Sequence, residues 1–348
     1  MGKFVNEVYF AGMNTAQGFV SYFNEIFGGC KKIYVIKGGP GTGKSRLMND
    51  IAQEAELRGL ETEKFLCSSD PCSLDGLIIK NSGTAIVDGT SPHIYEPTAV
   101  GLKEKIVDVS AFLDPYKLND HSKDIFALLN AKSRKYNSIY SYLKVIGVYD
   151  NEINTCCKNA YLEDKAEKII LKLSRLLKKD NSYQKRILPR SAVGFDGEIV
   201  LGTYSSMASK RYALTDICGI SGDFLQKLLS VTDEKRISVF VSFSPLCPSK
   251  PDALFYPASG ISFYTGSETD NDETVLNMRR FINDEKLRPY KPQIRALTRL
   301  RNGAVKQMEF DFKAIKRLHM SLEEIYISAM DFSGKEILTK QIIKEIFT

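Results

Sequence analysis

The chain has 348 residues, of which 43% are hydrophobic and 26% are charged, a composition typical of a globular protein with a sizeable core. The length indicates about two domains. The formal net charge of +6 does not support nucleic-acid binding, because dedicated binders concentrate basic residues on one face. No segment has the roughly 20 apolar residues of a membrane helix, so no membrane role is expected. Seven irregularly spaced cysteines are typical of a reduced cytoplasm, so we expect a cytoplasmic protein.

A glycine-rich loop follows the first predicted buried strand. Residues Lys32–Lys37 (KIYVIK) are β-branched and aromatic, which predicts a strand, and Ser45–Arg58 has the apolar spacing of a helix. The loop between them, GGPGTGKS, satisfies the G-x-x-x-x-G-K-[ST] pattern. In such a loop, backbone N–H groups and the helix amino terminus surround phosphates, the lysine reaches the β- and γ-phosphates, and the serine hydroxyl binds Mg²⁺. The predicted nucleotide-binding residues are Gly38, Gly39, Pro40, Gly41, Thr42, Gly43, Lys44, Ser45 and Arg46.

A carboxylate that would complete a Mg²⁺ site follows another predicted strand. Residues Thr84–Val87 have the pattern of a buried strand, and Asp88 stands at its carboxyl end, as a Walker B aspartate does. The predicted metal ligands are therefore Ser45 and Asp88. Many ATPases place a glutamate directly after this aspartate to polarise water, but this chain has Gly89. The sequence predicts that any catalytic base comes from another segment.

Two loops are candidates to position the nucleophile. One follows the predicted strand Thr62–Cys67 and contains Asp70 and Asp75, and the other follows the Walker B strand and contains His93 and Glu96. Ligands bind outside the carboxyl ends of strands in open α/β sheets, so both loops are expected near the phosphates. His93 is favoured because its pKa suits proton transfer, although a turn or surface role explains each residue singly equally well. The predicted catalytic residues are Lys44, Asp70, Asp75 and His93.

The second half of the chain repeats part of the first half. Moving the chain by 177 residues places Asp75–Thr90 on Asp252–Ser267, with five identities in sixteen positions. Moving it by 178 residues places the phosphate loop region on Lys210–Leu225. The matches occur in the same order in both halves. We therefore predict an internal duplication.

The second copy lacks the residues that would bind a Mg-nucleotide. In this alignment Gly222 stands where the first copy has Lys44, and Asp223 stands where it has the loop serine. Thr265 replaces the Walker B aspartate, and an aspartate in the loop would repel phosphate. The predicted fold class is α/β, a P-loop NTPase fold that is internally duplicated, with helical additions and a degenerate second copy. The predicted domains are a P-loop NTPase domain with a helical extension over residues 1–185 and a degenerate P-loop-like domain with C-terminal helices over 186–348.

Each half is predicted to end in a helical tail. The first tail extends from about Gly101 to Lys179, and the second contains the segments SLEEIYISAMD and KEILTKQIIKEIF. The polar segment Lys179–Glu198, which contains proline and glycine, is the predicted linker between the halves.

Several segments resemble a family of uncharacterised bacterial ATP-binding proteins made of two tandem P-loop domains. They are FAGMNTAQGF (Phe10–Phe19), KGGPGTGKS, CSSDPCSLDG, VDGTSPH and EEIYISAMDF, and the resemblance spans most of the chain. It implies binding and hydrolysis of ATP, no particular substrate, and a place for Asn14, Thr15 and Gly18 on the nucleotide side. The missing lysine in the second half departs from the family, whose members resemble intact duplications.

The leading prediction is an ATP hydrolase with one competent site, which uses ATP and Mg²⁺. A small-molecule or nucleotide kinase is an alternative, in which the loops around Asp70–Asp75 and His93 would hold an acceptor. A third possibility is a non-enzymatic switch held in shape by the nucleotide. The arginine cluster of the chain lies in the second half, from Arg279 to Arg301, and not in a lid after the glycine loop, which disfavours the kinase. The sequence does not identify a substrate or a protein partner, and it is compatible with an oligomer.

Overall fold

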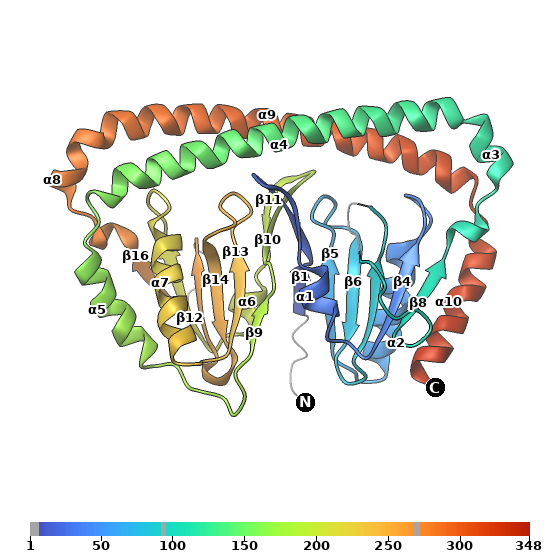
Figure 1. The fold of residues 1–348 in the computed structure, drawn as a ribbon, viewed down its shortest axis with the longest axis horizontal. Helices are drawn as coiled ribbons and strands as arrows, with labels where there is room; N and C mark the ends of the chain where they lie inside the picture. Colours follow the sequence, from blue (N-terminus) through green and yellow to red (C-terminus); the bar gives the residue numbers. More distant parts are fainter. Residues whose placement is uncertain (1–6, 92–94, 267–271) are drawn as a thin grey trace.

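A computed structural model describes residues 7–91, 95–266 and 272–348 of the protein. Two six-stranded mixed sheets lie side by side, and two long helices run along the top of both (Figure 1). The strand order of the first sheet is β1-β5-β6-β7-β4-β8, and that of the second is β9-β13-β14-β15-β12-β16.

The first half begins with an edge strand and a small hairpin and ends with the long helix α4 and the shorter α5. Its elements are β1 (Glu7–Phe10), β2 (Gly12–Thr15), β3 (Gly18–Ser21), α1 (Phe23–Phe27), β4 (Lys32–Lys37), α2 (Lys44–Leu57), β5 (Thr62–Leu66), β6 (Leu74–Ile79), β7 (Thr84–Asp88), β8 (Glu104–Asp108), η1 (Ser110–Phe112), α3 (Pro115–Asp120), α4 (Ser122–Lys158) and α5 (Glu163–Ser174).

The second half repeats this order of elements. Its elements are β9 (Lys185–Ile187), β10 (Ser191–Gly194), β11 (Gly197–Val200), α6 (Thr203–Met207), β12 (Lys210–Thr215), α7 (Ile220–Glu234), β13 (Val239–Phe243), β14 (Pro251–Tyr256), η2 (Pro257–Ser259), β15 (Ile261–Thr265), β16 (Glu273–Asn277), η3 (Met278–Phe281), α8 (Asp284–Leu287), η4 (Arg288–Tyr290), α9 (Lys291–Ser328) and α10 (Phe332–Phe347). The mixed α/β architecture is confirmed, and the repeated strand order is compatible with the predicted duplication.

Strand β4 lies inside the first sheet and carries the glycine loop at its carboxyl end. It pairs in parallel with β7 on one side and β8 on the other. Four consecutive residues of β4, Ile33–Ile36, are almost fully buried, as expected for a strand that is covered on both faces. Helix α2 then packs Leu47, Met48 and Ile51 into the same core. The predicted strand, loop and helix therefore occur in the predicted order.

The helical tails exchange partners between the halves. Helix α4 leaves the first half and runs antiparallel to α9, so that α5 lies against α7 of the second half (Figure 1). Helix α9 returns in the opposite direction, and α10 lies against α2 of the first half. Leu173 of α5 belongs to the core of the second sheet, and Ile342 of α10 belongs to the core of the first. Each tail covers the sheet of the other half, so the two halves are interlocked.

Two expectations about local structure are wrong. The tail predicted from Gly101 contains the strand β8, which pairs with β4, and the predicted linker Lys179–Glu198 contains β9 and β10. The edge strands β8 and β9 carry few buried residues, so their sequences lack the apolar alternation that reveals a strand. In place of a linker, Arg186 of β9 donates two hydrogen bonds of 2.7 Å to the buried carboxylate of Glu63. This segment is therefore a folded part of the contact between the two halves and not a free linker.

The two halves also share a hydrophobic core. Tyr9 and Phe65 from the first half pack in one cluster with Tyr204 and Tyr264 from the second half. The rings of Tyr9 and Tyr204 meet edge to face at 6.3 Å. Among the helices in the part of the chain that the structure describes, none is both long and apolar enough to cross a membrane.

Candidate functional site

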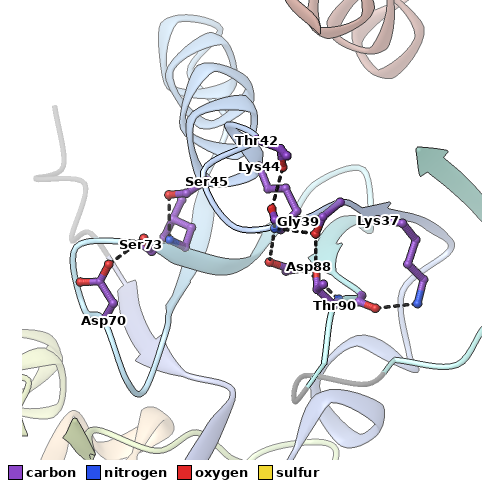
Figure 2. Close-up of polar contacts among 12 residues, drawn as sticks. Lys37, Gly39, Thr42, Lys44, Ser45, Asp70, Ser73, Asp88 and Thr90 are labelled. Carbon is purple, nitrogen blue, oxygen red and sulfur yellow. Dashed lines mark hydrogen bonds and ion pairs between the residues drawn. The ribbon is translucent and has the colours of Figure 1, made fainter. Parts of the chain in front are cut away.

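The glycine loop lies between β4 and α2 and has the backbone geometry that its sequence requires (Figure 2). Gly41 and Gly43 have φ angles of +70° and +81°, in the left-handed region that side chains disfavour. The hydroxyl of Thr42 donates a 2.8 Å hydrogen bond to the carbonyl of Gly39, which closes the loop on itself. Helix α2 begins directly after Gly43, so its free amino-terminal N–H groups face the loop.

Lys44 lies across the loop and faces the carboxylate at the end of the neighbouring strand. Its Nζ donates to the carbonyl oxygens of Gly38 at 3.0 Å and Gly39 at 2.7 Å. The same nitrogen lies 3.7 Å from Oδ2 of Asp88 (Figure 2). The parallel register that pairs Ile36 with Asp88 brings these groups together. A cation and a carboxylate therefore meet at the carboxyl ends of two adjacent strands.

Ser45 and Asp88, the predicted metal ligands, both line the cavity beside the glycine loop. The Ser45 hydroxyl accepts a 2.9 Å hydrogen bond from the N–H of Leu74. Asp88 accepts hydrogen bonds from the N–H of Thr90 at 2.8 Å and from its hydroxyl. Mg²⁺ usually binds one or two protein oxygens together with substrate phosphates and water. One hydroxyl and one carboxylate fit that pattern.

A cavity of about 560 Å³ lies over the glycine loop. Its floor is the loop together with the segments that follow β5 and β7, and its roof comes from the two long helices. The volume is within the usual range of a small-molecule site. The roof residues include Leu129, Lys132 and Tyr136 from α4 and His319, Glu323 and Tyr326 from α9.

The predicted acidic residues Asp70 and Asp75 both line this cavity. Asp70 is engaged in its own turn, where it accepts hydrogen bonds from the N–H of Cys72 at 3.3 Å and the hydroxyl of Ser73 at 3.1 Å. Asp75 is buried near the start of β6. Because β6 runs antiparallel to its neighbours, its start lies at the edge where the parallel strands end.

Other predicted residues lie apart from the cavity lining or outside the described part of the chain. His93 lies outside the described residues. The Arg46 side chain is 79% exposed, extends toward Asp50 at 3.9 Å, and is not part of the cavity lining. Asn14 is buried, and its Nδ2 donates a 3.0 Å hydrogen bond to the carbonyl of Val193 in the second half. It also lies 3.4 Å from the hydroxyl of Ser69, which lines the cavity.

Helix α9 lies directly on the glycine loop, a contact that the sequence did not reveal. A Cβ atom on Gly39 would lie 2.4 Å from the Tyr326 ring, and one on Gly41 would lie 3.0 Å from the backbone oxygen of Glu323. The Glu323 side chain lines the cavity beside this loop. Glycine at these two positions thus allows a helix from the second half to touch the loop of the first.

Three titratable side chains form a chain across the roof. Lys132 Nζ lies 2.9 Å from Nδ1 of His319, and Nε2 of His319 lies 3.5 Å from Oε1 of Glu323. Burial, reinforced by the positive charge of Lys132, lowers the pKa of His319 to about 4. A neutral imidazole that accepts from Lys132 at Nδ1 carries its proton on Nε2, which faces Glu323.

The pKa values of the other roof groups are shifted as well. Burial raises the pKa of the Glu323 carboxyl, and the nearby charge of Asp70 raises it further. Burial lowers the pKa of Lys132. Perturbed pKa values gathered in one cavity are typical of functional sites.

The equivalent loop of the second half is closed by a carboxylate of its own. Asp216 accepts hydrogen bonds from the N–H of Gly219 at 2.8 Å and from the N–H of Ser221 at 2.9 Å. The hydroxyl of Ser221 also donates to Asp216 at 2.6 Å. These are the donors that a phosphate would use in such a loop. The second loop satisfies them internally.

The structure corrects the alignment of the two loops. Four residues separate β12 from α7, whereas six separate β4 from α2, so the second loop is two residues shorter. When the helices are aligned at their left-handed cap glycines, Gly43 and Gly219, the counterpart of Lys44 is Ile220, not Gly222. The counterpart of Ser45 is then Ser221. The ungapped alignment had paired Ser45 with Asp223.

Asp223 lies further along α7 than the alignment had implied. Its carboxylate pairs with Lys250 at 2.7 Å and accepts a 2.8 Å hydrogen bond from Asn154 of α4. The second half therefore lacks the loop lysine, as predicted, but the aspartate that occupies the loop is Asp216.

Comparison with known proteins gave no relative. No protein-family model, curated protein or solved structure matches the chain. The resemblance to tandem P-loop ATP-binding proteins therefore stays a prediction.

Proposed function

We propose that the protein binds Mg-ATP at the glycine loop Gly38–Ser45 and hydrolyses it at one competent site in the first half. The observation that carries this proposal is the approach of Lys44 Nζ to the Asp88 carboxylate, 3.7 Å apart at the ends of two adjacent parallel strands. Both groups line a cavity large enough for a small ligand.

The loop and its lysine supply the groups that phosphoryl transfer needs. Backbone N–H groups of the loop and the amino terminus of α2 would surround the phosphates. Lys44 would leave the carbonyls of Gly38 and Gly39 for the phosphate oxygens, because a charged acceptor binds an ammonium more strongly than a carbonyl does. Ser45 and Asp88 would hold Mg²⁺, which neutralises charge on the phosphates when it is bound.

The single competent site follows from the contrast between the two loops. The second loop has Ile220 where the first has Lys44, and its Asp216 already accepts the loop N–H groups. A nucleotide would have to displace a carboxylate that belongs to the loop itself. One equivalent of nucleotide per chain is therefore expected.

A nucleotide-dependent switch is the second candidate function. The observation that favours it is the direct contact of Tyr326 and Glu323 of α9 with the glycine loop, which links the nucleotide site to the other half. A switch would bind nucleotide tightly with negligible turnover. Multiple turnover above about 1 s⁻¹ would exclude this alternative.

The test combines thermal melting with phosphate release for the natural chain and for Lys44→Ala. Ligand at about a hundred times its Kd should stabilise the natural chain by roughly 2.7 kcal/mol. Lys44→Ala should lose this stabilisation and phosphate release. Arg46→Ala removes a neighbouring cation whose side chain lies outside the cavity lining, so it should behave like the natural chain. An unchanged response of Lys44→Ala to Mg-ATP would contradict the proposal.

A further inference from the structure

The position that carries the catalytic glutamate in many ATPases is closed to any side chain here. A Cβ atom on Gly89 would lie 2.5 Å from Cγ1 of Val35 and 3.1 Å from the end of the Lys37 side chain. Lys37 also donates a 2.5 Å hydrogen bond to the Gly89 carbonyl, which fixes the strand end. A base for hydrolysis must therefore reach the phosphates from another direction.

The roof of the cavity supplies a carboxylate at the required place. Glu323 of α9 lines the cavity, and its backbone oxygen would lie 3.0 Å from a Cβ atom on Gly41, in the middle of the glycine loop. N–H groups of such a loop are the donors that hold phosphate oxygens. The Glu323 side chain therefore lies beside the place where the phosphates would bind.

The roof also provides a partner that would hold the Glu323 carboxylate over the cavity. His319 lies one helical turn before Glu323, with its Nε2 3.5 Å from the carboxylate. Lys132 of α4, 2.9 Å from Nδ1, fixes the tautomer that carries the proton on Nε2. The imidazole therefore donates toward Glu323, and keeps the carboxylate over the cavity.

We propose that Glu323 is the catalytic base of nucleotide hydrolysis, delivered by the second half of the chain, with His319 and Lys132 as positioning residues. This inference rests on the proposed function. The Glu323 carboxylate takes a proton from water while the water oxygen forms a bond to the γ-phosphorus. The bond from this phosphorus to the β–γ bridging oxygen breaks, and its electron pair stays on ADP. The proton then passes from Glu323 to the released phosphate.

Glu323→Gln tests the base directly, and the adjacent Glu324→Gln is the matched control. Glu324 undergoes the same change of charge one residue away, on an exposed face of α9. For Glu323→Gln, kcat for phosphate release should fall by about 100-fold or more, the usual loss when a general base is removed. Binding of a non-hydrolysable ATP analogue should be unchanged or tighter, because a competing anion is gone. Glu324→Gln should match the natural chain in both measurements.

His319→Gln tests the positioning role. Its kcat should fall while KM stays within about threefold, and the acidic limb of the kcat–pH profile should move, because the partner of Glu323 has changed. A merely structural role would leave that limb in place, and this result would overturn the assignment of His319.

Two results would overturn the assignment of Glu323, and each is distinguishable from failure of the proposed function. One is a kcat of Glu323→Gln within about threefold of the natural value while Lys44→Ala is inactive. The other is tighter nucleotide binding by Glu323→Gln with a higher kcat, which would make Glu323 only a competitor of the nucleotide. Nucleotide binding by the natural chain without turnover would contradict the proposed hydrolysis itself and favour the switch. If Lys44→Ala binds nucleotide as the natural chain does, the proposed function itself fails.

Discussion

The two glycine loops occupy the same position in the same strand order, yet the carboxylates beside them have different origins. The carboxylate beside the first loop is that of Glu323, which lines the cavity and comes from a helix of the other half that lies on Gly41. In the second loop the N–H groups of Gly219 and Ser221 bind Asp216, a carboxylate of the loop itself. A carboxylate on a separate helix can move away when phosphate arrives, whereas a carboxylate built into the loop cannot leave without rearranging it. The origin of the nearby carboxylate, as well as the loss of a lysine, therefore distinguishes the loop proposed to bind nucleotide from the second loop.

The helix ends that lie over the two loops, called their covers here, also differ in the side chains that they place on each loop. The last turns of α9 cover the first loop, and the last turns of α4 cover the second. Over the second loop, the buried side chain of Asn154 donates to the carbonyl of Cys218 at 3.0 Å and to Asp223 at 2.8 Å. An amide neither titrates nor competes with phosphate. The cover of the second loop therefore holds the loop carbonyl of Cys218 through an amide, while that of the first loop places the ionisable chain Lys132–His319–Glu323 over the cavity.

The first prediction has the largest effect and concerns the pH dependence of stability. It tests whether His319, in the cover of the first loop, titrates at a lower pH in the folded protein than in the unfolded chain. The unfolded chain takes up a proton on His319 near pH 6.5, but the folded protein takes it up only near pH 4, so acidification between these values favours unfolding. His319→Gln lacks this group. Between pH 6.5 and pH 4 it should lose less stability than the natural chain, by at most about 3 kcal/mol. Urea unfolding at several pH values measures the difference.

His121→Gln is the control for this comparison. The His121 side chain is 49% exposed and lies far from the loop in sequence, at the start of α4. Its pH profile of stability should run parallel to that of the natural chain. A His319→Gln profile that also runs parallel would show that the cover of the first loop does not titrate as proposed.

The next effect compares one glycine in each loop. Gly41 and Gly219 both have left-handed φ angles, +70° and +75°, so alanine at either position should cost about 1 kcal/mol in stability. At Gly41 the new Cβ would also lie 3.0 Å from the backbone oxygen of Glu323 and from Ile327, whereas at Gly219 the nearest atom is 3.4 Å away. We expect Gly41→Ala to cost about 1 kcal/mol more than Gly219→Ala, because α9 must move away. Equal melting temperatures would show that α9 does not rest firmly on the loop.

The parts of the site that the sequence predicted are local in the chain. The loop of Lys44 follows its strand and precedes its helix directly, so the pattern of residues specifies the geometry almost alone. Asp88 was found because a buried strand that ends in an aspartate is itself a local signal. Asp75 lines the cavity, but it does so from strand β6 and not from the predicted loop, because the antiparallel direction of β6 was not visible in the sequence.

The parts that the sequence missed depend on packing between distant segments. Glu323 and His319 reach the loop only because α9 crosses from the second half, and helix periodicity does not reveal which partner a helix will cover. The ungapped alignment placed Gly222 on Lys44, since it kept the offset of the preceding strand although the loop after that strand is two residues shorter. The edge strand β9 was taken for a linker because its stability comes from pairing and from the contact of Arg186 with Glu63.

The smallest expected effect concerns the closed loop. Asp216→Ala removes the acceptor of three hydrogen bonds at the start of α7, and since Asp216 is exposed, the loss should resemble that of a helix cap, about 1 kcal/mol. It should not create a second nucleotide site, because Ile220 still stands in place of Lys44 and Thr265 in place of Asp88, the proposed metal ligand. Calorimetric titration with a non-hydrolysable ATP analogue and Mg²⁺ should give one equivalent per chain for both proteins. A second equivalent in Asp216→Ala would mean that the Asp216 carboxylate alone prevents nucleotide binding to the second loop. Nucleotide binding would then depend less on a loop lysine than on loop N–H groups that have no internal acceptor.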